Sequence, residues 1–130
     1  MDLNALYKSV LDADSQPIVL CDLRHTVVYM NPTAVRRYAK RGGAALVGTN
    51  IMDCHAPASR EKILQVVDWF AQSSENNDVF TFHSDKENSD VYMIALRNEA
   101  GELIGYYEKH ESRVPETRRA YEELAENKNE

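Results

Sequence analysis

The chain has 130 residues, 43% hydrophobic and 28% charged, which is the composition of one globular domain and excludes a disordered chain. The net charge is −6, and this acidic excess argues against a nucleic-acid partner, because backbone phosphates are bound by dense Lys and Arg. The sequence shows no apolar stretch long enough for a membrane span, no secretory signal and only two cysteines, so we expect a cytoplasmic protein.

Residues 1–13 predict an amphipathic helix with Asp2 as its N-cap. Its apolar side chains recur at helical spacing: Leu3, Leu6, Tyr7, Val10 and Leu11. An exposed apolar stripe of this kind marks an interaction surface, so we expect a homodimer through this helix. In the alternative, the helix folds back onto its own domain and the protein is a monomer.

Two short apolar runs at residues 17–22 and 26–31 predict a β-hairpin. Asn31 and Pro32 then provide an N-cap and a first helical residue, so a helix is expected to run to about residue 41. After two short helical turns, a longer helix is expected up to residue 72, with Ser59 as its cap.

Three further strands are predicted at residues 78–84, 90–98 and 102–111. Two strands before a helical segment and three after it indicate an α+β domain with one five-stranded antiparallel sheet and helices on one face. The domain is expected to span residues 14–113. Residues 114–130 predict a polar tail helix that starts near Pro115.

Four segments in this order resemble the PAS family. They are Pro17-Ile18-Val19-Leu20-Cys21-Asp22, Val28-Tyr29-Met30-Asn31-Pro32-Thr33-Ala34, Leu46-Val47-Gly48-Thr49-Asn50 and the hairpin from Arg97 to Tyr106. The resemblance implies the strand order 2-1-5-4-3 and a role in sensing or dimerisation. It names no ligand, because PAS domains differ in what they sense.

A closer resemblance lies in the stretch from Asp53 to Ser59, which contains Cys-His-x-Pro-x-Ser. It is similar to PAS domains attached to hemerythrin-like modules and to their standalone relatives. Some PAS domains hold haem through a histidine near the long helix, which makes His55 a candidate haem ligand. The plainer interpretation is that His55 caps the helix or bonds a backbone carbonyl group.

Other chemistries receive less support from the sequence. Ile51 stands where light-sensing PAS domains carry their reactive cysteine, so a flavin–cysteinyl adduct is not expected. His25, His83 and His110 lack the spacing of a zinc site; His25 is expected in a turn and the other two in solvent. Cys54 beside His55 lacks a third orienting group, so we expect no enzyme.

The sequence therefore predicts a sensory module that binds a small ligand, a cofactor or a partner protein. The candidate pocket residues, which would equally serve a filled core, are Ile51, Met52, His55, Ile63, Val67, Phe80, Phe82, Met93 and Ala95. The alternatives are a ligand-free dimerisation module and a haem sensor using His55. The basic pair Arg36 and Arg37 is interpreted as a solvated helix face.

Overall fold

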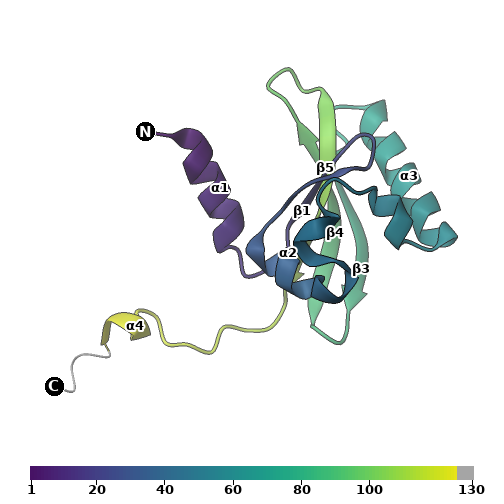
Figure 1. Ribbon diagram of the computed structural model, residues 1–130. Coiled ribbons are helices and arrows are strands. Elements are labelled where there is room, and N and C mark those ends of the chain that lie inside the picture. Colours follow the sequence, from purple (N-terminus) through teal and green to yellow (C-terminus); the bar gives the residue numbers. More distant parts are fainter. Residues whose placement is uncertain (126–130) are drawn as a thin grey trace.

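The computed structural model describes residues 1–125 and contains one five-stranded antiparallel sheet (Figure 1). The strand order is β2-β1-β5-β4-β3, which confirms the predicted α+β architecture and strand order. The strands are β1 (Val19–Asp22), β2 (Val27–Met30), β3 (Asp78–Ser84), β4 (Ser89–Arg97) and β5 (Leu103–Ser112).

The central pairing of β1 with β5 depends on a close approach of the two backbones. Gly105 lies opposite Asp22, and a Cβ atom at this position would collide with the carbonyl oxygen of Cys21. Glycine is therefore required where the first and last strands meet, and this pairing closes the sheet between distant parts of the chain.

The segment between β2 and β3 forms the helical layer. Its elements are α2 (Pro32–Arg37), the 3₁₀ helices η1 (Ala39–Arg41), η2 (Gly43–Leu46) and η3 (Ile51–Cys54), and α3 (Pro57–Gln72). These helices cover one face of the sheet and enclose the core (Figure 1). The buried members of the core are Cys21, Val27, Met30, Ala34, Phe70, Met93 and Tyr106.

Two helix boundaries in this layer differ from the sequence prediction. The helix that begins after Asn31 ends at Arg37, and residues up to Arg41 continue as a tighter 3₁₀ turn. The long helix begins at Pro57 with Ala56 in the cap position, so the predicted cap Ser59 lies inside the helix. Proline is favoured at the first helical position because its fixed φ suits a helix, so the helix begins at Pro57, two residues before Ser59.

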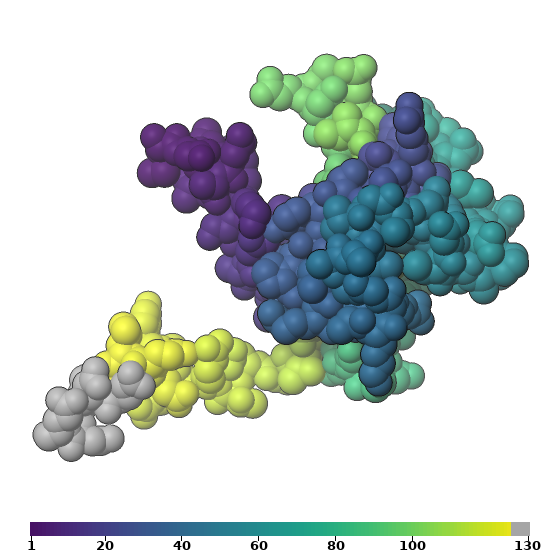
Figure 2. Space-filling model, viewed as in Figure 1, coloured from purple at the N-terminus to yellow at the C-terminus, as the bar shows by residue number. Residues whose placement is uncertain are grey.

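Helix α1 (Leu3–Ala13) projects away from the body of the domain (Figures 1 and 2). The side chain of Asp2 accepts from the Ala5 N–H and so provides the predicted N-cap. Only the end of the helix is attached: Asn31 donates to the Leu11 carbonyl oxygen, and the Tyr29 hydroxyl bonds the Asp12 carboxylate. No residue of α1 is buried.

The tail differs from the predicted helix. Residues 114–121 form neither a regular helix nor a strand, and α4 spans only Glu122–Ala125. Tyr121 and Leu124, the expected apolar face, are both exposed, and an isolated short helix without packing gains little stability. The remaining predicted helical residues, 126–130, lie outside the described part of the chain. No helix within residues 1–125 has the length and apolar character that crossing a bilayer requires.

Candidate functional site

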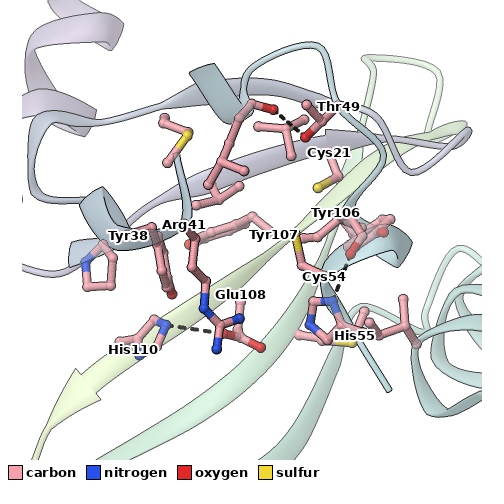
Figure 3. Close-up of a pocket in the computed structure, with 18 residues that line it drawn as sticks. Cys21, Tyr38, Arg41, Thr49, Cys54, His55, Tyr106, Tyr107, Glu108 and His110 are labelled. Carbon is pink, nitrogen blue, oxygen red and sulfur yellow. Dashed lines mark hydrogen bonds and ion pairs between the residues drawn. The ribbon is translucent and has the colours of Figure 1, made fainter. Parts of the chain in front are cut away.

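The main candidate site is a cavity of about 150 Å³ between the sheet and the helical layer (Figure 3). Most of its lining is apolar, and the largest share of the lining residues comes from β5, with others from β1, β2, β4, η3 and α3. The apolar side chains include Val19, Val27, Met30, Ile51, Ile63 and Met93. Polar side chains that also line it are Tyr38, Arg41, His55, Glu108 and His110.

The structure brings together only part of the predicted pocket set. Four of the nine residues, Ile51, His55, Ile63 and Met93, line the cavity. Val67 and Ala95 pack against the neighbouring core, and Met52 is half-buried, but none of the three is among the lining residues.

Phe80 and Phe82 differ most from the expectation. They are 57% and 50% exposed and lie on β3, the edge strand of the sheet. A register shift between the two residues interrupts the simple alternation of faces, so strand periodicity could not place them. Phe80 packs against Tyr92, with ring centroids 5.5 Å apart, rather than against the cavity.

His55 is held at the cavity by backbone contacts on both sides. It follows η3, whose first turn is capped by Asn50. The His55 ring places Nδ1 2.7 Å from the Ile51 carbonyl oxygen, and Arg60 donates to the His55 carbonyl oxygen at 2.8 Å. A carbonyl oxygen only accepts, so Nδ1 carries the hydrogen and the lone pair of the neutral ring lies on Nε2.

His110 is a second histidine at the cavity, and the sequence had placed it in solvent. Its side chain is only 6% exposed, and its Nε2 lies 3.3 Å from a carboxylate oxygen of Glu108. Its buried Nδ1 has no hydrogen-bond partner among the described residues. The cavity is therefore edged by two imidazole groups, of which sequence reasoning proposed only His55.

Part of the wall on the sheet side is formed by Cys21 and Tyr106, both buried. The Tyr106 hydroxyl lies 2.8 Å from Nδ1 of His25, which occupies the predicted turn with a φ of 66°. Burial raises the pKa of the Cys21 thiol to about 11, and burial also raises the pKa of Tyr106. Both groups are neutral near pH 7, which keeps this wall uncharged.

Metal ligation and thiol chemistry were the other site types considered for Cys54 and His55. The described residues contain no cluster of three His, Cys, Asp or Glu side chains that could hold a metal ion. Cys54 is exposed, and the ring nitrogen of His55 that forms a hydrogen bond is committed to Ile51.

Comparison with solved structures identifies the fold. A PAS domain from Colwellia psychrerythraea superposes with a TM-score of 0.62 at 14% identity, covering 85% of this chain and 97% of that one. The chain has the PAS fold. A sensory box sensor histidine kinase from Vibrio cholerae matches with a TM-score of 0.57 at 17% identity, covering 85% of this chain and 96% of its own.

The Aer2 receptor from Vibrio cholerae, described as a dual PAS-heme oxygen sensor, also matches. Its TM-score is 0.53 at 18% identity, with 75% of this chain and 94% of that chain covered. Comparisons with models of protein families and with curated proteins found no match. The structural neighbours of this PAS fold are thus sensory and signalling domains, and these low identities establish the fold alone.

Proposed function

We propose that this protein is a PAS-type sensory module that binds a small molecule in the cavity between the sheet and the helical layer. The observation that carries the proposal is the cavity itself. An apolar space of about 150 Å³ leaves its lining side chains without packing contacts on one side, which is a cost to the folded state. A bound molecule offsets this cost and links occupancy to stability.

The first experiment is mass spectrometry of the purified protein under native and denaturing conditions. The proposal predicts a native mass that exceeds the chain mass by that of one small molecule, which denaturation releases. An Ile63→Trp variant, which fills the cavity from α3, should lose the molecule. The matched control Leu64→Trp changes the exposed neighbour on the same helix and should retain it.

A ligand-free dimerisation module is the alternative. In that case neither the wild type nor the Leu64→Trp control carries an added mass, and Ile63→Trp changes nothing but stability. We also propose that the protein is cytoplasmic and not an enzyme: its two cysteines are free thiols, and Nδ1 of His55 bonds the Ile51 carbonyl oxygen. Rapid alkylation of Cys54 by iodoacetamide at pH 6 would contradict the non-catalytic assignment.

Haem is a second candidate, favoured by one observation and opposed by another. Haem-ligating histidines commonly donate their other ring N–H to a backbone carbonyl, as His55 does to Ile51. The volume of the cavity, however, is well below the volume of about 300–1,000 Å³ that is typical of pockets for larger ligands. A porphyrin therefore does not fit it. Haem titration tests this conclusion: a Soret band in wild type that is lost in His55→Ala would overturn it.

We further propose that α1 joins two copies of the chain into a homodimer. Leu3, Leu6, Tyr7 and Val10 are between 45% and 71% exposed, although α1 is anchored at its end by Asn31. The helix stands away from its own domain (Figure 2), so its apolar stripe is not packed against that domain.

The sheet offers a surface that fits this stripe. On the face opposite the core, one cross-strand row pairs Tyr29 with Leu20, Leu20 with Tyr107, and Tyr107 with Ile94. These side chains are half-buried, and a second copy of α1 would cover them with apolar contacts. The same residues in both chains would then form a symmetric interface.

Light scattering at high micromolar concentration tests the dimer. Wild type should have twice the chain mass, and a Leu6→Lys, Val10→Lys double variant should be monomeric. Ala5→Lys, on the opposite side of α1, is the matched control and should remain dimeric. A monomeric wild type would contradict the proposal.

A further inference from the structure

The volume of the cavity limits the size of its ligand. An apolar protein cavity of about 150 Å³ accepts benzene. The present cavity has this volume, so it accommodates one six-membered ring with a short substituent.

The character of the lining excludes a strongly charged ligand. Most of the wall is apolar, and the buried Cys21 and Tyr106 remain neutral because burial disfavours their charged forms. Arg41 and Glu108 carry opposite charges and line the same cavity, so this pair adds no net charge to its wall. The site is therefore suited to a neutral molecule.

His55 adds a directional requirement. With Nδ1–H donated to Ile51, the second ring nitrogen presents a lone pair and accepts hydrogen bonds. His110 has the same character, since its Nε2–H faces Glu108 and its buried Nδ1 is without a partner among the described residues. Nδ1 of His110 is unfavourable as a buried acceptor unless a donor reaches it, and the half-buried His55 adds a second acceptor at the cavity, so the cavity favours a ligand with a donor group.

We propose that the ligand is a neutral one-ring aromatic compound with a hydroxyl group that donates to Nε2 of His55. This inference rests on the proposed function, because it assigns a ligand class to the same cavity. Phenol and toluene provide a matched pair of probes: both have seven non-hydrogen atoms, and only phenol carries a donor. Without an acceptor in the cavity, toluene is the better ligand, because the phenol hydroxyl would lose its bonds to water.

Calorimetric titration of the full chain with each probe tests the inference. Wild type should bind phenol at least about fivefold more tightly than toluene, as a hydrogen bond to an acceptor in the cavity predicts. His55→Leu should lose this preference for phenol. A His110→Leu variant should keep the preference of wild type for phenol.

The outcomes separate the two proposals. Wild type that binds toluene as tightly as phenol would overturn the donor requirement and leave the proposed function intact. Binding of neither probe would contradict the proposed function itself. Loss of the preference in His110→Leu but not in His55→Leu would overturn the assignment to His55.

A measurement on the wild type tests the same inference without a variant, so it remains valid if a variant fails to fold. In ¹⁵N spectra of the histidine rings, Nε2 of His55 should have the shift of an unprotonated nitrogen and move toward lower ¹⁵N shift on adding phenol. Toluene should leave the signal in place. An Nε2 that is already protonated in the free protein would overturn the inference.

Discussion

Asn31 joins four parts of the fold through one fully buried side chain. Its Oδ1 accepts from the N–H groups of Ile18 and Ala34, both at 2.9 Å. Its Nδ2 donates to the carbonyl oxygens of Leu11 and Gln16 at 2.9 and 3.0 Å. The end of α1, the start of β1 and the start of α2 therefore depend on this residue.

We predict that Asn31→Ala lowers the free energy of unfolding by about 3–4 kcal/mol. The lost N-cap contributes about 1 kcal/mol, and each of the other three hydrogen bonds contributes about 0.5–1.5 kcal/mol. The midpoint of urea unfolding measures the loss. Asn50→Ala, which removes an exposed cap from η3, is the control and should cost no more than about 1 kcal/mol.

The Asn31→Asp variant distinguishes the contribution of the accepted hydrogen bonds from that of the two hydrogen bonds that Nδ2 donates. The aspartate retains both acceptor positions but places an oxygen opposite the carbonyl groups of Leu11 and Gln16. It should also be less stable than wild type, and the amide protons near the end of α1 should exchange faster. An Asp variant as stable as wild type, with unchanged exchange in α1, would refute this account of the anchor.

Two further predictions concern the half-buried Arg97 and the buried Cys21. Arg97→Met should lower the free energy of unfolding, measured in urea, by about 3 kcal/mol, because the guanidinium donates to three carbonyl groups at and after the end of α3. The control Arg113→Met, at an exposed arginine, should lower it by less than about 1 kcal/mol. Because burial raises the pKa of Cys21 from 9.0 to about 11, the native state binds its proton more tightly, and the free energy of unfolding should fall as pH rises from 9 to 11. The loss is on the order of 2 kcal/mol and should be absent from Cys21→Ala; equal alkaline loss in both proteins would contradict it.

Local signals explain why much of the fold was predictable from sequence. Asn31 and Pro32 act within a few residues, so their N-cap and first-turn positions follow from residue type alone. The five strands are short apolar runs bounded by turn residues, and the structure places each within two residues of its predicted ends. Their order required the resemblance to the PAS family, because strand signals do not specify pairing.

The candidate site was less predictable because it depends on distant contacts. His110 lies at a strand end, where solvent exposure is the simplest expectation, but tertiary packing leaves it only 6% exposed. Phe80 and Phe82 were misplaced because a register shift at an edge strand has no clear sequence signal. The hydrogen bonds of Arg97 were not predictable from the sequence, because its partners are the backbone carbonyl groups of Phe70, Ser73 and Asn76, which any residue type provides.

Methyl NMR of the four methionines tests the central claim, that the cavity binds a small molecule. Met30 and Met93 line the cavity, whereas Met1 and Met52 are not among its lining residues and serve as internal controls. On titration with phenol, the methyl signals of Met30 and Met93 should shift in a saturable way, and those of Met1 and Met52 should remain unchanged. Unchanged signals for all four, or equal shifts in all four, would contradict it.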